Sequence, residues 1–360
     1  MIEPDREGTT PRNSARMDAR EDRIDTVDSL RGVAVLAVVW FHLTNGNPML
    51  PSSWLRTSGR LGWLGVEVFF VISGFVIPHA LYRANYRLRD CGRFLLRRAA
   101  RLEPPYVVSI FLMMGLALIS ARLPGFRGHL PSYSVPQLLS HLPYVTGLLG
   151  FTWINIAYWS LALELQYYLL IGWVFPLIAH QKIGVRVLTI LLLEALAFVI
   201  PNDLLVFHWL PLFVMGVLTF MHRHALLNVR WYVVSVIGAT ACTLVTFGPI
   251  IAVVGSATSL MIAFVDINAS PLLFLGSISY SLYLVHVPIG GRLINATLRF
   301  SLGPVTIATV TVVTLGVSIL AATVFYRLVE QPAKQLAFRI EIRKRSTGRY
   351  RSEVDTYSMH

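Results

Sequence analysis

The chain has 360 residues, of which 55% are hydrophobic and only 14% are charged, and its formal net charge is +12. Soluble domains carry about 25% charged residues, so this composition excludes an ordinary soluble globular protein and indicates a membrane protein. The excess positive charge falls between apolar segments, which is typical of a membrane protein rather than of a nucleic-acid-binding one. We therefore expect the lipid bilayer as a partner and no nucleic acid.

The two ends of the chain are polar and differ from the apolar region between them. Residues 1–27 are charged, mixed in sign and without an apolar core, which does not fit a cleavable signal peptide and predicts a disordered cytoplasmic tail. A membrane domain is predicted over 28–332, followed by a basic cytoplasmic tail over 333–360. Cys91 and Cys242 show neither a disulfide pattern nor metal-ligand spacing, so no metal site is predicted.

The first apolar segment, DSLRGVAVLAVVWFHL, contains both Arg31 and His42. Eleven residues make about three helical turns, so the two side chains share one face, roughly 16 Å apart along the axis. Because a spanning helix needs about 20 mostly apolar residues, the sequence predicts an all-α membrane protein with about ten transmembrane helices and no soluble catalytic domain. The predicted spans are 28–47, 61–82, 103–121, 156–179, 187–201, 205–222, 231–247, 250–266, 272–291 and 303–327.

The distribution of basic residues predicts the orientation in the membrane. The segment 83–101 holds seven arginines and a single acid, Asp90, so the positive-inside rule makes it cytoplasmic. With ten spans, both termini are then cytoplasmic as well. The longest outer loop is predicted at 122–145, where its prolines suit a segment that covers a site from above.

Four ionisable residues on four different spans are predicted to lie at one depth near the outer face: His42, Glu67, Glu164 and His286. Each alone has an ordinary explanation, such as a hydrogen-bonded core histidine or an interfacial acid beside aromatic residues. Charged groups in the hydrocarbon region are costly, however, and usually face a cavity or one another. Their common depth therefore predicts a buried polar site.

A second cluster lies at the inner face, where FLLRRAARLEPPY leads into the third span. Pro104 and Pro105 are expected to break or kink the helix that follows. The arginines are either a topology anchor or a patch that binds the phosphates of a polyanionic ligand. The three arginines of this inner cluster lie on one helical turn: Arg97, Arg98 and Arg101.

These motifs together resemble the integral-membrane acyltransferase-3 family over almost the whole chain. Arg31 and His42 match the arginine and histidine that mark the family's first helix. The segments GVEVFFVISGF, FLLRRAARLEPPY, YWSLALELQYYL, GSISYSLYLVH and YRLVEQPA resemble further family blocks in the same order. The fourth block departs from the family at Leu165, where a second acid is more common, so no catalytic role is assigned there.

The resemblance implies an enzyme, an O-acyltransferase that moves an acyl group, usually acetyl, from acyl-CoA to a hydroxyl. Acyl-CoA is then a co-substrate, and no bound cofactor is expected. The acceptors of the family include exopolysaccharide, lipopolysaccharide precursors, oligosaccharide signals and macrolides, so the acceptor is expected to be a carbohydrate or glycolipid. A multi-pass protein of a bacterial inner or plasma membrane is implied.

The residues can be assigned roles on this basis. A hydroxyl needs a base beside it at neutral pH, and His42 has a suitable imidazole. Glu67 or Glu164 could orient this imidazole, and we favour Glu67 because consecutive helices are usually neighbours. Arg31, Arg97, Arg98 and Arg101 are expected to bind the donor's phosphates. Acceptor-binding or supporting roles are expected for Tyr158, Trp159, Ser160, Glu164 and His286.

Two alternatives to a carbohydrate O-acyltransferase remain open from the sequence. One is an O-acyltransferase for a macrolide or another small molecule. The other, from a different class, is a proton-coupled carrier, which would also need ionisable groups within the membrane. A carrier is expected to show repeated halves with broken helices in matching positions, and the sequence shows no such repeat.

Overall fold

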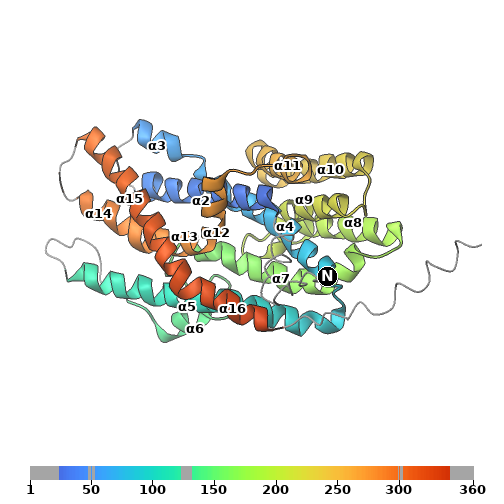
Figure 1. The fold of residues 1–360 in the computed structure, drawn as a ribbon, viewed down its shortest axis with the longest axis horizontal. Helices are drawn as coiled ribbons and strands as arrows, with labels where there is room; N and C mark the ends of the chain where they lie inside the picture. The colour runs from blue at the N-terminus through green and yellow to red at the C-terminus, as the bar shows by residue number, and fades with distance from the viewer. Residues whose placement is uncertain are drawn as a thin grey trace, which may run out of the picture. The chain divides into compact units, whose positions relative to one another are not determined.

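The computed structural model describes residues 24–47, 50, 53–122, 132–298, 300 and 303–340. Most of the two predicted tails, at 1–23 and 341–360, lies outside these residues. The described part of the chain is helical and contains no β-strand (Figure 1). Its elements are α2 (Asp25–Asn45), α3 (Trp54–Gly59), η1 (Gly62–Leu64), α4 (Gly65–Arg83), η2 (Leu88–Asp90), α5 (Cys91–Ala121), α6 (Val135–His141), α7 (Tyr158–Ile178), α8 (Ile183–Val199), α9 (Val206–Arg223), α10 (Val229–Phe247), α11 (Pro249–Phe264), α12 (Ser270–Ser277), α13 (Ser279–His286), η3 (Val287–Gly291), α14 (Arg292–Thr297), α15 (Pro304–Phe325), η4 (Tyr326–Glu330) and α16 (Gln331–Arg339).

Seven helices in the described residues are long and apolar enough to cross a membrane, which confirms an all-α, multi-pass membrane protein. All ten predicted spans coincide with helices, but three of them do not meet this test as single helices. α8 has 17 residues and α11 has 16, so each is shorter than the roughly 20 residues that a bilayer requires. The predicted span at 272–291 is a pair of helices bent by 63°. The count of ten therefore stays a prediction.

The ends of several helices differ from the predicted boundaries. α2 begins at Asp25, inside the predicted N-terminal tail, and α16 continues to Arg339, inside the predicted C-terminal tail. The sequence predicts that Pro104 and Pro105 break or kink the third span; a break is wrong, because both lie inside α5, which runs without interruption from Cys91 to Ala121, and a kink stays a prediction. Adjacent prolines remove only two backbone N–H donors, and the turns on either side keep the helix continuous.

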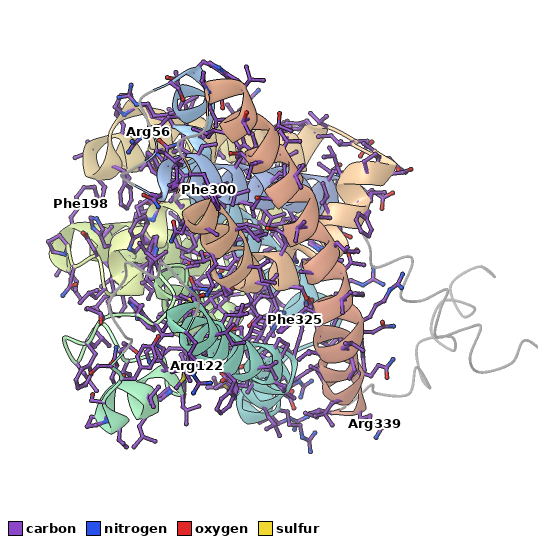
Figure 2. The ribbon with its side chains drawn as sticks, turned by 90° about the vertical axis from the view of Figure 1, so that its left-hand side faces the viewer. Arg56, Arg122, Phe198, Phe300, Phe325 and Arg339 are labelled. Atoms are coloured by element: carbon purple, nitrogen blue, oxygen red, sulfur yellow. The ribbon has the colours of Figure 1, made fainter. Side chains whose placement is uncertain are left out.

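The chain divides into two compact units. The first unit contains the described residues up to Ser73 and Pro211–Thr323, and the second contains Gly74–Leu210 and the described residues from Val324 onward. The polypeptide passes between the units inside α4, inside α9 and at the end of α15. Apolar side chains are exposed on several of the long helices, such as Phe198 on α8 (Figure 2), and suit contact with lipid.

Glycines bring other helices against α2 in the first unit. A Cβ added at Gly32 would lie 2.3 Å from the carbonyl oxygen of Leu272, and one added at Gly276 would lie 2.0 Å from that of Asp28. Only a residue without a side chain allows α2 and α12 to approach so closely. Gly65, at the start of α4, approaches the carbonyl oxygen of Ala34 in the same way.

The N-terminal turn of α2 also holds the extended segment between α11 and α12. Thr26 Oγ1 donates to the carbonyl oxygen of Val265 at 2.8 Å and accepts from the backbone N–H of Ile267 at 2.9 Å. Ser29 Oγ donates to the carbonyl oxygen of Ile267 at 3.1 Å. These side chains supply partners for backbone groups that the extended segment leaves without helical hydrogen bonds.

Candidate active site

His42 lies in the last turn of α2, and a backbone hydrogen bond determines which of its ring nitrogens carries the proton. Its Nδ1 is 2.9 Å from the carbonyl oxygen of Val38, one turn earlier. A carbonyl oxygen only accepts, so Nδ1 of the neutral ring carries the hydrogen. The other nitrogen, Nε2, then holds a lone pair, and it has no hydrogen-bond partner among the described residues. That arrangement leaves Nε2 able to take a proton.

The ring beside His42 belongs to His286, at the end of α13. His286 Nε2 is 3.3 Å from His42 Nδ1, and the ring centroids are 5.0 Å apart. His286 Nδ1 is 3.0 Å from the carbonyl oxygen of Leu282, so its hydrogen also lies on Nδ1 when the ring is neutral. The free lone pair on His286 Nε2 therefore faces the His42 Nδ1–H group. The His286 side chain itself is fully buried.

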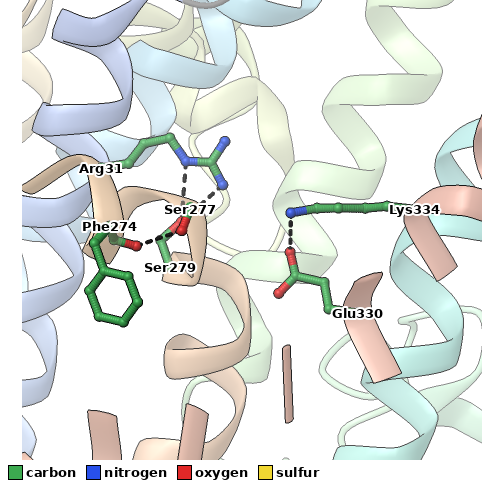
Figure 3. A network of polar contacts seen from close by, with 6 residues as sticks. All are labelled: Arg31, Phe274, Ser277, Ser279, Glu330 and Lys334. Carbon is green, nitrogen blue, oxygen red and sulfur yellow. Dashed lines mark hydrogen bonds and ion pairs between the residues drawn. The ribbon is translucent and has the colours of Figure 1, made fainter. Parts of the chain in front are cut away.

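Arg31, at the other end of the α2 stripe, is bound to the start of α13. Its Nε and Nη2 donate to Ser279 Oγ at 3.2 and 3.0 Å (Figure 3). Ser279 and His286 are seven residues apart, about 10 Å along α13, whereas Arg31 and His42 are about 16 Å apart along α2. The long arginine side chain spans the difference. α13 is thus held to α2 at both of its ends, by Ser279 and by His286.

Glu67 lies two residues after the close approach of Gly65 to α2, and its side chain is only 3% exposed. Its Oε2 has no hydrogen-bond partner among the described residues. No hydrogen bond joins it to His42 in that part of the chain, and the place expected for Glu67 beside His42 Nδ1 is taken by His286. Depth alone does not determine which way a side chain points around its helix. The catalytic role of Glu67 stays a prediction, without that hydrogen bond to support it.

Glu164 and Arg98 belong to one polar network in the second unit. The Tyr168 hydroxyl donates to Glu164 Oε1, one turn earlier on α7. The Arg98 guanidinium lies 5.3 Å from the centre of the Tyr168 ring and 5.7 Å from that of Phe94. Arg98 is therefore enclosed by aromatic rings, a cation–π arrangement that stabilises a partly buried charge. This environment favours a structural role for Arg98 over phosphate binding.

The other arginines of the inner cluster have fewer aromatic neighbours than Arg98. Arg97 lies over one ring, that of Phe338 on α16, at 5.2 Å from its centre, whereas Arg98 lies over two. Arg101 lies on the same helix one turn further on and is half-buried. On α16, Lys334 Nζ is 2.7 Å from Glu330 Oε1 (Figure 3).

The residues predicted to bind the acceptor fall into two groups. Tyr158 is fully buried and hydrogen-bonded to Ser109 at 2.7 Å, and Ser160 is buried and donates to the carbonyl oxygen of Ala157. Both therefore contribute to the interior of the second unit. Trp159 is half-buried and lies 5.5 Å from the Trp209 ring, beside a surface pocket.

A set of buried residues before α7 was not expected from the sequence. His141 is buried, its Nδ1 lies 2.8 Å from the carbonyl oxygen of Gln137, and its Nε2 accepts from the backbone N–H of Ile154 at 3.1 Å. Burial lowers the pKa of His141, and accepting at Nε2 requires the neutral ring. Tyr144, three residues on, has a left-handed backbone with φ of 57°. The signal was the turn HLPY, which ends α6 with a tyrosine where glycine is usual.

The fold and these polar residues define a class, a multi-pass helical membrane protein with ionisable side chains buried among its helices. A family model described as an acyltransferase domain matches residues 24–323. The chain therefore belongs to the acyltransferase-3 family, which confirms the resemblance seen in the sequence.

Individual relatives agree with the family assignment. The O-acetyltransferase OatA of Staphylococcus aureus (strain NCTC 8325 / PS 47) is 26% identical over 374 residues, which cover 87% of this chain and 57% of the relative. The peptidoglycan O-acetyltransferase OatA of Listeria monocytogenes is 29% identical over 41% of this chain and 23% of the relative. "Protein 2 in picA locus" of Rhizobium radiobacter is 37% identical over 26% of this chain and 44% of the relative. The chain spans a little more than half the length of the S. aureus relative. No solved structure matches it.

Proposed function

We propose that the chain is a membrane-embedded O-acyltransferase that moves an acetyl group from acetyl-CoA to a hydroxyl of a carbohydrate. Family membership and the relatives named O-acetyltransferase support this reaction class. The observation that carries it is the state of His42, whose Nδ1–H is fixed by Val38 and His286 and whose Nε2 lone pair is left free. A base with a fixed tautomer is what activation of a hydroxyl requires.

The chemistry that follows is direct transfer. His42 Nε2 takes the proton of the acceptor hydroxyl as its oxygen attacks the thioester carbonyl. The new C–O bond forms and the C–S bond breaks, which gives the ester and the CoA thiolate. The proton on His42 then passes to the thiolate and yields the CoA thiol, so the base returns to its starting state. His286 Nε2 accepts from His42 Nδ1–H throughout and stabilises the positive charge that the ring carries in between.

The donor's phosphates are expected to be recognised by arginines. Two nitrogens of Arg31 are bound to Ser279, but Nη1 makes no hydrogen bond with the described residues and remains a donor. Arg97 and Arg101 retain the role predicted for them, since a guanidinium suits phosphate oxygens. Arg98 is left out of the donor site because aromatic rings enclose it. We place the protein in a bacterial cell membrane, with both termini and these arginines on the cytoplasmic side.

The test is a transfer assay on purified protein in detergent, where no ion gradient exists. Labelled acetyl-CoA is supplied with an oligosaccharide, and both the labelled ester and the free CoA thiol are measured. Wild type should produce both, and His42→Ala should lower the rate by about 10²–10⁴-fold, as expected for loss of a general base. His180→Ala, a change in the loop between α7 and α8, is the matched control and should be neutral.

Two results would contradict the proposal. A His42→Ala variant with activity near wild type would remove His42 as the base. A wild-type protein that consumes no acetyl-CoA in detergent, but moves a solute across vesicles when a proton gradient is applied, would establish a carrier instead.

A further inference from the structure

The second unit contains an open pocket that the catalytic proposal does not use. Its walls come from the loop before α7, the first two turns of α7 and the loop before α9. It is an open depression rather than an enclosed cavity, since its empty space of about 280 Å³ includes open solvent. The lining residues that matter here are Tyr144, Trp153, Trp159, Gln166, Asp203 and Leu204.

One wall of the pocket is fixed by hydrogen bonds. Gln166 Oε1 accepts from the backbone N–H of Val206 at 2.8 Å, and its Nε2 donates to the carbonyl oxygen of Leu204 at 3.0 Å. Trp209 Nε1 donates to the carbonyl oxygen of Asp203 at 3.0 Å, and the Trp209 ring packs against Trp159. The loop before α9 is therefore fastened to α7 from both sides, and the wall exists before any ligand arrives.

The opposite wall is built on an unusual backbone. Tyr144 has a φ of 57°, a conformation that costs a non-glycine residue on the order of 1 kcal/mol or more. Its ring stacks on Tyr106 with centroids 4.4 Å apart, and its hydroxyl is hydrogen-bonded to Glu103. Trp153 packs edge-on against the neutral His141 at 5.4 Å. Two buried partners thus position the aromatic side chains of this wall.

Two polar groups at the pocket keep unused hydrogen-bonding capacity within the described residues. Trp153 Nε1 donates to none of them. Asp203 Oδ1 is 3.3 Å from His208 Nε2, whereas Oδ2 accepts from none, and the Asp203 side chain is 80% exposed. The pocket therefore presents a hydrogen-bond donor, an acidic acceptor and aromatic faces together.

We propose that this pocket binds one sugar ring of the acceptor, an inference that rests on the proposed function. A pyranose has an apolar face of C–H groups, which packs on an indole, and hydroxyls around its edge, which donate to a carboxylate and accept from an indole N–H. Because the pocket is open to solvent and encloses little space, it suits one ring that lies against its aromatic side chains rather than a whole macrolide. The Asp203 carboxylate disfavours an acidic sugar, so the ring is a neutral or N-acetylated hexose.

The ordinary explanation for Trp159 is the aromatic belt found where helices meet the membrane surface. A belt residue projects toward lipid, as Trp173 on the same helix does with 64% of its surface exposed. Trp159 is half-buried, packs on another tryptophan and lines the same pocket as Asp203. Trp173 is therefore a matched control, because its replacement removes an indole from α7 and leaves the pocket unchanged.

The experiment measures binding and transfer separately. Chitotetraose and maltotetraose are titrated into purified protein while tryptophan fluorescence is recorded, with no acetyl-CoA present. Acetyl transfer to the same oligosaccharides and acetyl-CoA hydrolysis without them are then measured.

Trp159→Ala should raise the acceptor KM at least tenfold, and Asp203→Asn should raise it at least fivefold. Both variants should leave the rate of acetyl-CoA hydrolysis within twofold of wild type. Gly147→Leu, which fills the space beside Trp153 and Leu204, should act like Trp159→Ala, and Trp173→Ala should change nothing.

Each outcome decides one of the two proposals. A saturable fluorescence change in wild type that Trp159→Phe reduces, and that Trp173→Phe retains, supports the pocket even if no transfer is seen. No saturable change with either oligosaccharide, or an unchanged acceptor KM in both Trp159→Ala and Gly147→Leu, overturns it. An absence of acetyl-CoA consumption by wild type overturns the proposed reaction alone, because the titration does not depend on catalysis.

Discussion

At the scale of single residues, the two histidines form a chain of hydrogen bonds that is anchored on the backbone. The Leu282 carbonyl determines the tautomer of His286, and the His286 lone pair together with the Val38 carbonyl then determines the tautomer of His42. A second imidazole thus takes the position that a carboxylate holds in a catalytic triad. It orients the ring without adding a negative charge to the hydrocarbon region, where an ionised group is costly.

This arrangement makes His286 a positioning residue, and its replacement should affect catalysis rather than donor binding. His286→Ala removes the acceptor for His42 Nδ1–H and should lower kcat by roughly 10- to 100-fold, since an interaction made in the transition state is lost. His286→Gln keeps a carbonyl oxygen near the same place and should recover part of that loss. The KM for acetyl-CoA should stay within about twofold of wild type in both variants. Steady-state kinetics with both substrates varied would measure the split.

A purely structural role for His286 makes a different forecast. The alanine and glutamine variants would then lose activity in proportion to their loss of thermal stability, and glutamine would give no rescue. Equal kcat in wild type and His286→Ala would rule out the positioning role.

The sequence alone identified both histidines and placed them at one depth, but it did not pair them. Depth follows from counting residues along a span, because each residue adds a fixed rise of about 1.5 Å. The partner of His42 depends also on the rotation of α13 about its axis, which the apolar pattern of a membrane helix barely constrains, since lipid and protein interior are both apolar. Glu67 was therefore predicted at the position that His286 occupies.

At the scale of helices, the site depends on how closely α12 and α13 can approach α2. Gly32 and Gly276 allow two backbones into direct contact, and α13 follows α12 immediately, across the bend at Ile278. A side chain at either glycine would push against a carbonyl oxygen, which cannot rotate away as a side chain would. The sequence shows that the chain has 25 glycines. It does not show which of them lie at helix crossings, because Gly32 and Gly276 contact residues more than 200 positions away.

We predict that Gly276→Ala destabilises the protein and lowers activity. The added Cβ would lie 2.0 Å from the Asp28 carbonyl oxygen, so the helices must separate, and overpacking of this kind costs about 1–3 kcal/mol. Separation also draws Ser279 and His286 away from α2. Gly238→Ala in α10 is the matched control, since nothing lies within 4 Å of a Cβ at that position. It should be neutral or stabilising by roughly 0.5–1 kcal/mol, as for any exposed glycine in a helix.

Thermal unfolding in detergent, followed by size-exclusion chromatography of the heated samples, would measure both variants. Equal melting temperatures for Gly276→Ala and Gly238→Ala would show that the α2–α12 contact is looser than the structure has it.

At the scale of the whole chain, apolar length and charge bias predicted a multi-pass helical protein correctly, but left the number of spans open. α8 and α11 are too short to be counted on length alone, and they are bounded by loops with few charges. A bent pair such as α12–α13 reads in sequence as one apolar run, because the break falls at a single Gly276–Ser277 pair and at Ile278, without a proline. Composition determines the class of the protein, whereas bends depend on packing that the sequence does not display.

The inner arginines lead to a prediction that separates their two candidate roles, topology anchor and donor binding. Arg97 and Arg101 share one face of α5, one turn apart, whereas Arg89 and Arg93 lie just before them and are exposed. Both pairs count equally for the positive-inside rule, which depends on the number of basic residues near the membrane and not on their exact position.

A double change to glutamine removes two charges in either case, so a topology effect should be the same for both pairs. Phosphate binding depends on geometry, so a donor effect should appear for Arg97→Gln/Arg101→Gln alone. We expect that variant to raise the KM for acetyl-CoA about tenfold with little change in kcat, and the Arg89→Gln/Arg93→Gln variant to match wild type.

Reporters inserted after residues 90 and 130 should remain cytoplasmic and external, respectively, in all three proteins. If both variants invert the reporters, the arginines serve as an anchor; if neither changes the donor KM, the phosphates of acetyl-CoA are bound elsewhere.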